Sequence, residues 1–371
     1  MRSIGPLLFL AACSGDPSDK PTTDTVPGGG DSAASEGTGG DAGGGVEGGG
    51  VEGGDDSRAD SPTESTAPPD STPPDSPTDS APDSAPPEPE NTIRFVALGD
   101  AGEGNDTQYQ VADAMEAVCA VVGCDFALYL GDNFYESGVE SADDELFETA
   151  FELPYAYLDF PFYVSLGNHD YGGNGAGYEY WKADYQLEYA LTSDKFILPD
   201  NYYTFEEGPA DFFALDTNLI FWGFGADEQT WLDEATAAAD GPWKIAFGHH
   251  PYISNGSHGN AGNYEGLSWL PIVNGEAIKE FDEASICDQV DVYICGHDHD
   301  RQWLEATCGT EFLISGAGAK TTDMEHREDN PYWWEANTPG FLWVEVTETT
   351  FTGVFYDADG VEEYRRTITL D

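Results

Sequence analysis

Short apolar segments recur along the chain from residue 92 onward, and most of them are rich in β-branched or aromatic side chains. Segments of about four to eight such residues, bounded by turn residues, are typical of strands that are buried on both faces. The expected strands are 92–98, 125–130, 160–166, 211–216, 243–247, 290–295 and 311–315.

Helical periodicity lies between several of these strands, at 106–120, 226–239 and 275–284. Alternating strands and helices predict an α/β fold around a buried sheet. Beyond residue 340 the pattern changes, because apolar and polar residues alternate without an intervening helix. This change predicts antiparallel strands at 341–349, 350–358 and 364–370. Residues 92–371 contain no second linker, so we expect one folded domain.

Residues 14–91 differ sharply from the rest, since they are mostly Gly, Ser, Thr, Pro, Asp and Glu and contain almost no large apolar side chain. Such a segment cannot bury enough apolar surface to offset its chain entropy, so we expect it to be disordered. Its glycine-rich part is expected to be flexible and its proline-rich part to be extended. The segment is either a spacer or a tail without a function.

The first thirteen residues, MRSIGPLLFLAAC, combine an arginine with an apolar run that is too short to span a bilayer. We therefore expect an export signal. The ending Leu-Ala-Ala-Cys resembles the lipobox of bacterial lipoproteins, which implies that Cys13 is acylated and starts the mature chain. The expected location is then the bacterial cell surface or the periplasm, with Cys13 as the only membrane anchor. A plain secretory signal is the alternative.

The net charge of −58 is not confined to the tail. Residues 1–90 hold 18 acidic and 3 basic side chains, so the remaining 53 acids and 10 bases leave a net charge of −43 on the rest of the chain. Such a surface repels nucleic acid and has no basic patch to bind it. An anionic substrate would therefore need local positive charge, which metal ions can supply.

Five cysteines remain after Cys13, and in an exported protein they favour disulfides. Cys119 and Cys124 bracket a short loop, and Cys287 and Cys308 flank another segment, so two bridges are possible. Cys295 would then be a buried thiol. The alternative is that all five thiols are free.

Five of the expected strands end in a glycine followed by a side chain with an oxygen or nitrogen donor. These endings are VALGDAG, LYLGDNFY, VSLGNHD, IAFGHHP and YICGHDHD. Because sites in open α/β sheets assemble at the carboxyl ends of strands, we expect these side chains to meet. Turn preference explains one such ending, but not five.

The endings supply seven candidate metal ligands: Asp100, Asp132, Tyr135, Asn168, His249, His297 and His299. Carboxylate and phenolate oxygens suit a hard, highly charged ion, whereas imidazole and amide groups suit a divalent one. Seven donors with one shared carboxylate can serve two ions and leave positions for water and substrate. His297 and His299 are two residues apart, so each can reach a different ion while Asp298 points away.

Formal charge favours one trivalent and one divalent ion. Two aspartates, a tyrosinate and a hydroxide carry four negative charges, which such a pair of ions exceeds by one. The resulting slight positive charge attracts a phosphate monoester, whereas two divalent ions would leave the site neutral.

The five endings resemble those of the purple acid phosphatases, within the calcineurin-like metallophosphoesterase superfamily. GDNFY, GNHD, GHHP and GHDH are most similar to the small, tartrate-resistant acid phosphatase type, and the resemblance runs from about residue 93 to 320. Gly102 stands where most of the superfamily has the histidine of Asp-x-His, and Tyr135 in its place marks the purple subfamily. The resemblance implies a β-sandwich of two mixed sheets flanked by helices.

The resemblance also implies the roles of single residues. Fe(III) would be bound by Asp100, Tyr135 and His299, a divalent Fe, Zn or Mn ion by Asn168, His249 and His297, and Asp132 would bridge the two. His169 and His258 match histidines that contact substrate in the family, although His258 can also be an exposed loop histidine. His250 is not expected to be a ligand, and His326 is expected at the surface.

The activity that the resemblance implies is hydrolysis of phosphate monoesters, either small ones or those of phosphorylated peptides. A metal-bound hydroxide would attack phosphorus, with His169 or His258 as the proton donor and with an acidic optimum. The alternatives are a phosphodiesterase or nucleotidase on the same metals, a surface lipoprotein that binds iron or phosphate without turnover, and peroxide chemistry at an iron pair. We expect a monomer whose specificity depends on loops 136–152, 171–200 and 321–340.

Overall fold

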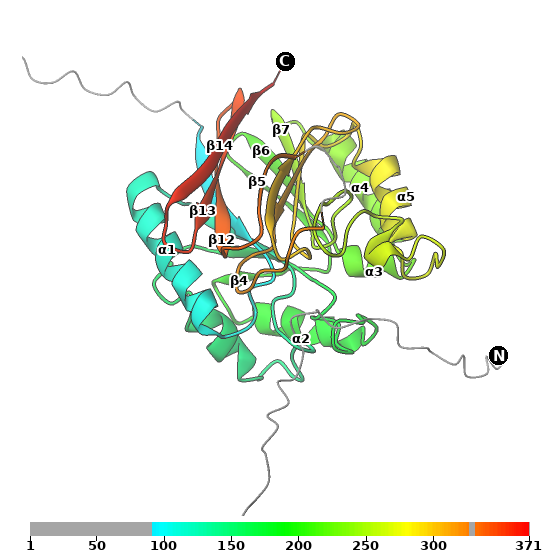
Figure 1. The fold of residues 1–371 in the computed structure, drawn as a ribbon, viewed down its shortest axis with the longest axis horizontal. Helices are drawn as coiled ribbons and strands as arrows, with labels where there is room; N and C mark the ends of the chain where they lie inside the picture. Colours follow the sequence, from blue (N-terminus) through cyan, green and yellow to red (C-terminus); the bar gives the residue numbers. More distant parts are fainter. Residues whose placement is uncertain (1–90, 326–330, 371) are drawn as a thin grey trace, which may run out of the picture. The chain divides into compact units, whose positions relative to one another are not determined.

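The computed structural model describes residues 91–325 and 331–370. Within these ranges two seven-stranded sheets form a sandwich (Figure 1). The first sheet has the spatial order β14 (Glu362–Thr369), β13 (Thr350–Asp357), β12 (Gly340–Val346), β1 (Ile93–Leu98), β2 (Phe126–Leu130), β3 (Phe162–Ser165) and β4 (Phe196–Ile197). The second has the order β11 (Pro331–Glu335), β9 (Arg301–Leu304), β10 (Glu311–Ser315), β8 (Val292–Cys295), β7 (Trp243–Phe247), β6 (Ala210–Ala214) and β5 (Tyr203–Glu207).

Both sheets are mixed, as expected. In the first sheet β1 to β4 run parallel, whereas β12, β13 and β14 are antiparallel to their neighbours. In the second sheet β6, β7, β8 and β10 run parallel, β5 pairs antiparallel at one edge, and β9 and β11 pair antiparallel on the other side. The parallel strands of both sheets therefore direct their carboxyl ends toward loops that can build one site.

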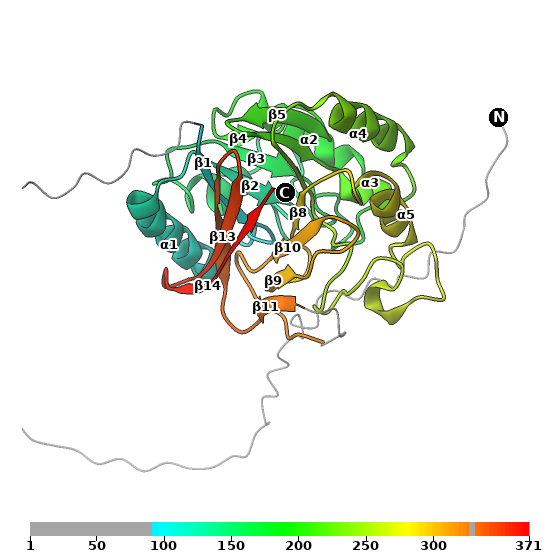
Figure 2. The same ribbon diagram turned by 90° about the horizontal axis from the view of Figure 1, so that it is seen from above.

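Helices cover the outer faces of the sandwich (Figure 2). The helices are α1 (Asp106–Val122), α2 (Trp181–Ala190), α3 (Thr217–Phe221), α4 (Ala226–Ala238) and α5 (Glu276–Ser285). In the views, α1 lies outside the first sheet, and α4 and α5 lie outside the second. None of the helices in the described ranges combines the length and the apolar character that a membrane crossing requires.

Aromatic side chains fill the space between the sheets. The Phe212 ring of the second sheet contacts the rings of Phe95 and Phe126 of the first sheet, with centroid distances of 5.6 and 5.4 Å. Strands β2, β6, β8 and β10 are buried along their whole length, which explains why β2 and β8 are continuously apolar and why β6 and β10 are apolar apart from residues at or near their ends. Burying a large apolar side chain contributes roughly 1.5–3 kcal/mol, so this core holds the strand ends rigidly in place.

Both disulfides that the sequence made possible are present. Cys119–Cys124 links the end of α1 to the approach to β2, and Cys287–Cys308 links the end of α5 to the approach to β10. Cys295 is a buried free thiol in β8, as predicted.

Three segments predicted to be loops contain regular structure. Loop 171–200 contains α2, loop 136–152 ends in a π-helix at Phe147–Glu152, and loop 321–340 contains β11. Helix α2 was not predicted because it shows no apolar periodicity: the side chains that it buries are Lys182, Ala183 and Gln186. The expected signal, Cys13, the tether and His326 lie outside the described residues.

Candidate metal centre and adjoining pocket

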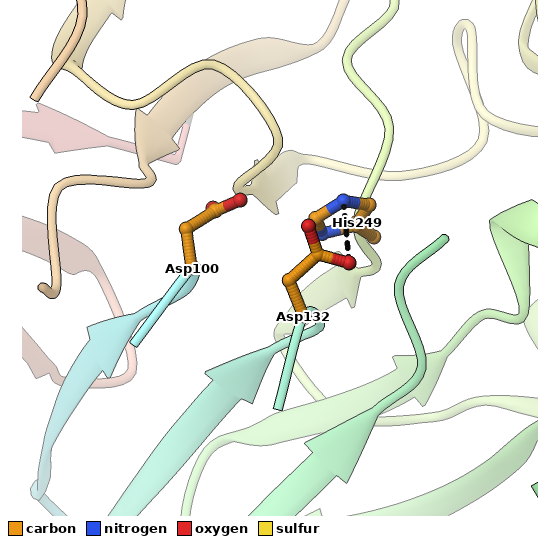
Figure 3. Close-up of side chains that lie close together, drawn as sticks. All are labelled: Asp100, Asp132 and His249. Atoms are coloured by element: carbon orange, nitrogen blue, oxygen red, sulfur yellow. Dashed lines mark ion pairs between the residues drawn. The ribbon is translucent and has the colours of Figure 1, made fainter. Parts of the chain in front are cut away.

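The side chains that follow β1, β2, β3, β7 and β8 meet at one end of the sandwich. Asp100 and Asp132 project from the ends of β1 and β2 toward His249, which follows β7 of the other sheet (Figure 3). Ligand atoms of these three buried residues all lie within 4.8 Å of one another. The two sheets therefore contribute jointly to this cluster.

A first donor group surrounds the phenol of Tyr135. Its oxygen lies 2.8 Å from Asp132 Oδ2, 3.1 Å from Asp100 Oδ1 and 3.3 Å from His299 Nε2. The Nδ1 atom of His299 lies 3.0 Å from Thr322 Oγ1, and this contact turns Nε2 toward the group.

A second donor group surrounds His249 Nε2. This nitrogen lies 2.9 Å from Asn168 Oδ1, 3.1 Å from His297 Nδ1 and 3.4 Å from Asp132 Oδ1. His249 Nδ1 lies 2.9 Å from the Leu130 carbonyl oxygen, which orients the ring. Asp132 thus contacts one donor group through each of its carboxylate oxygens.

The donor set fits metal ions better than it fits an ion-free state. Burial and the charges of Asp100 and Asp132 raise the pKa of the Tyr135 phenol well above its usual value, so ionisation there needs a strong cation. Burial lowers the pKa of His249, but the two aspartates outweigh it and raise that pKa to about 9. Two donor atoms that each lie about 2.0–2.2 Å from one ion, at right angles to each other, are about 3 Å apart. The donor–donor distances in both groups are close to this value.

Unusual backbone geometry accompanies the ligands. Asp100, Asp132 and His297 all have positive φ, at 56°, 52° and 71°. Left-handed conformations of residues other than glycine cost free energy and cluster at functional sites, where surrounding contacts enforce them. One such contact is the hydrogen bond from the His297 main-chain N–H to Asp100 Oδ2, at 2.8 Å.

Gly102 leaves room for the loop that carries Tyr135. A Cβ atom on Gly102 would lie 2.1 Å from the carbonyl oxygen of Asn133. The Tyr135 N–H donates to the Gly102 carbonyl at 3.0 Å. The glycine at 102 and the tyrosine at 135 are therefore linked by close main-chain contacts.

The structure places the expected histidines as follows. His169 lies over the Tyr135 ring, with a centroid distance of 4.4 Å, and its Nδ1 lies 2.7 Å from the Glu136 carbonyl oxygen. His258 lies over the His297 ring, with a centroid distance of 4.1 Å. His250 contacts Thr217 and does not take part in either donor group.

A pocket opens next to both donor groups. Its inner wall includes Asp132, Asn168, His169, His258, His297 and His299, and its outer wall includes Ala176, Phe221, Tyr264, Leu267 and Val273. Ala176 lies in loop 171–200, which was expected to set specificity, whereas the other residues of the outer wall lie outside the loops predicted for that role. No residue of 331–340 lines this pocket; Trp333 stacks on Phe355 and Tyr364 instead, and Tyr332 is exposed.

Sequence reasoning also missed Asp170 and Lys320. The buried Asp170 carboxylate accepts hydrogen bonds from the main-chain N–H groups of Asn133, Phe134 and Gly167, and so it ties the loop after β2 to the loop after β3. Asp170 is the last residue of the GNHD motif, so the motif itself could have indicated a role for this carboxylate. Lys320 Nζ lies 3.5 Å from the Tyr135 ring centroid and pairs with Glu103, an arrangement that no local pattern indicates.

Comparisons with known proteins agree with this geometry. Residues 93–301 match the family described as calcineurin-like phosphoesterase. Tartrate-resistant acid phosphatase type 5 of Rattus norvegicus is 27% identical over 319 residues, which cover 76% of this chain and 91% of the relative. Purple acid phosphatase 4 of Arabidopsis thaliana is 29% identical over 303 residues, which cover 74% and 83%.

Two solved structures share the fold. GAP50, described as the anchor in the inner membrane complex of Plasmodium, has a TM-score of 0.60 and 20% identity, covering 76% of this chain and 89% of that one. Purple acid phosphatase PPD1 from yellow lupin (Lupinus luteus) seeds has a TM-score of 0.58 and 16% identity, covering 75% and 54%. With a family match over more than half of its length and this strand-end site, the chain belongs to the calcineurin-like phosphoesterase family, with purple acid phosphatases among its relatives.

Proposed function

We propose that this protein is a dinuclear metal-dependent acid phosphatase that hydrolyses phosphate monoesters. The observation that carries the proposal is the position of Asp132, with Oδ2 at 2.8 Å from Tyr135 and Oδ1 at 3.4 Å from His249. A carboxylate shared in this way between two compact donor groups suits two neighbouring ions.

The two donor groups differ in chemistry, and this difference suggests different ions. Asp100, Tyr135 and His299 would hold Fe(III), since carboxylate and phenolate favour a hard ion, and Asn168, His249 and His297 would hold divalent Fe, Zn or Mn. When bound, such ions supply Lewis acidity to phosphoryl oxygens and make water more acidic.

His169 and His258 are suited to protonate the leaving group. The His169 ring contacts Tyr135 of the first donor group, the His258 ring contacts His297 of the second, and both histidines line the pocket. Burial lowers the pKa of His258, but the hydrogen bond to Glu265 and the charges of Asp298 and Glu265 outweigh burial, so the pKa is raised. A protonated imidazole at this place would contribute roughly 10²–10⁴-fold to the rate.

The test is turnover by the metal-loaded, full-length protein. We expect hydrolysis of p-nitrophenyl phosphate to exceed that of bis(p-nitrophenyl) phosphate, with about two metal ions per chain by elemental analysis. Faster diester hydrolysis would favour the phosphodiesterase alternative. Metal binding without any turnover would favour a binding protein.

We also propose that the protein is exported and anchored through an acylated Cys13, with residues 14–91 as the spacer. The sequence of residues 1–13 supports this proposal, as does the presence of two disulfides, which persist in oxidising compartments. Metabolic labelling with a fatty acid should mark the wild type, whereas Cys13→Ser should be unlabelled and recovered in the soluble fraction. An unlabelled wild type would leave the plain secretory signal.

A further inference from the structure

His258 lies on a loop that is fastened to the metal-centre motif itself. Its main-chain N–H donates to Asp298 Oδ1 at 2.7 Å, and Asp298 stands in the chain between His297 and His299. Ser254 donates a short hydrogen bond to the other carboxylate oxygen of Asp298. The backbone of this loop therefore follows the position of the strand end that carries the two candidate ligands.

The imidazole of His258 has a partner of its own. Glu265 Oε1 lies 2.5 Å from His258 Nδ1, and the Glu265 N–H donates to the His258 carbonyl at 2.9 Å. Glu265 has a φ of 55°, which is costly for a residue with a Cβ atom, so surrounding contacts hold it there. One of them is the bond from the N–H of the neighbouring Tyr264 to the Asn274 carbonyl, at 3.0 Å.

This contact decides which ring nitrogen can serve a substrate. With Nδ1 donating to the Glu265 carboxylate, Nε2 is the nitrogen available to a molecule in the pocket that His258 lines. A carboxylate that holds an imidazole in one orientation is a common device for positioning a proton donor.

We propose that Glu265 is a positioning residue, which holds His258 so that Nε2 faces the leaving oxygen of the phosphate ester. The inference rests on the proposed phosphatase activity. In the step concerned, a water oxygen bonds to phosphorus and the ester P–O bond breaks, with its electron pair moving to the leaving oxygen. That oxygen takes the proton from His258 Nε2, and a proton released from the attacking water restores His258.

The leaving group distinguishes positioning of a proton donor from a purely structural role. p-Nitrophenolate is stable as an anion and leaves without a proton, whereas the alkoxide of glycerol 2-phosphate needs one. In Glu265→Gln we expect kcat for glycerol 2-phosphate to fall about 10- to 100-fold, and kcat for p-nitrophenyl phosphate to change less than about threefold. KM should change little for either substrate.

Three further variants complete the test. Glu265→Asp should recover part of the alkyl phosphatase activity, and Glu280→Gln, which removes an exposed carboxylate from α5, should behave as the wild type. In the His258→Ala background, Glu265→Gln should have no additional effect. An equal fall of kcat for both substrates, or no fall, would overturn the proposal.

A spectroscopic readout separates this inference from the proposed function. In the metal-free protein, ¹⁵N NMR should show a proton on Nδ1 of His258 in the wild type and a weaker Nδ1–H hydrogen bond in Glu265→Gln. If Nδ1 of the wild-type His258 ring carries no proton, the positioning role of Glu265 is wrong, whether or not the protein hydrolyses either ester. A wild type with this signature and no turnover of either ester would contradict only the phosphatase proposal.

Discussion

The phenolic oxygen of Tyr135 lies 2.8 Å from Oδ2 of Asp132, close enough for both to bind one ion. This contact also raises the pKa of the phenol, after the larger effects of burial and of the charges on Asp100 and Asp132. Tyrosinate at this position therefore depends on a cation strong enough to displace the phenolic proton.

The Tyr135→Phe variant should lose the visible absorption of a tyrosinate–iron pair while keeping its fold, since only one oxygen is removed. The measurements are a visible spectrum and a thermal unfolding curve of the iron-loaded protein. Tyr109→Phe, at a partly exposed position on α1, is the matched control and should keep the colour. A coloured Tyr135→Phe protein would rule out this residue as the iron ligand.

Removing metal should destabilise the wild type and abolish its activity. The buried site brings together the acidic groups of Asp100, Asp132 and Tyr135. An ion that binds only the folded state stabilises it, and this stabilisation grows with the logarithm of the ion concentration divided by Kd. Chelation should lower Tm, and added Fe and Zn should restore it. In Asp132→Ala the Tm should hardly respond to metal; an undiminished response would mean that Asp132 does not bridge.

His169→Ala should lower kcat for an ester whose leaving group needs a proton, such as glycerol 2-phosphate, by about 10²-fold or more without releasing metal. The main-chain N–H of His169 holds Asp132 Oδ1 at 2.8 Å, and this bond survives the loss of the imidazole. Steady-state kinetics and elemental analysis of the same preparation check the prediction. Metal loss in parallel with activity would indicate that the ring supports the centre instead of the reaction.

Asp282 should make stability depend on pH. Burial, and to a lesser extent the charge of Glu283, raises the pKa of this carboxyl well above its usual value, and its Oδ2 is buried without a hydrogen-bond partner. The folded state thus holds a proton that the unfolded state has lost above about pH 4. The contribution of Asp282 to stability is favourable at low pH and declines as the pH rises above that value.

Asp282→Asn should therefore raise Tm by a few degrees at pH 7, roughly 2–4 °C for each kcal/mol, and by progressively less as the pH falls toward 4. Thermal unfolding at a series of pH values measures the difference from the wild type. Glu280→Gln removes an exposed carboxylate from the same helix and should show no such trend. A gain that does not depend on pH would exclude the ionisation of Asp282 as its cause.

The two disulfides should contribute unequally to stability. Cys287–Cys308 closes a loop with a sequence separation of 21, whereas Cys119–Cys124 has a separation of 5. In the chain-entropy description, the longer loop contributes about 1 kcal/mol more. The Cys287→Ser, Cys308→Ser pair should therefore lower the free energy of unfolding more than the Cys119→Ser, Cys124→Ser pair in denaturant titrations. The reverse order would mean that native-state contacts dominate.

Much of the fold was predictable because its determinants are local. Apolar runs bounded by turn residues marked the main strands of both sheets, and helical periodicity marked α1, α4 and α5. Elements whose buried side chains are polar, such as Lys182 and Gln186 of α2, gave no such signal. The tertiary structure decided these, because the buried Lys182 ammonium is satisfied by bonds to the Ser137 carbonyl and to Glu140, which lie far from it in the sequence.

The candidate site likewise has a part that the sequence predicted and a part that only the tertiary structure showed. The sequence alone determined which side chains stand at the strand ends, since a glycine and a donor residue after an apolar run are readable in a few neighbouring positions. Only the tertiary structure decided how Asp132 divides its oxygens between two donor groups, and that Glu265 meets His258. The reason is physical: these contacts depend on where separate loops are held by long-range hydrogen bonds, such as the bond from His258 to Asp298, and no short segment of sequence encodes that meeting.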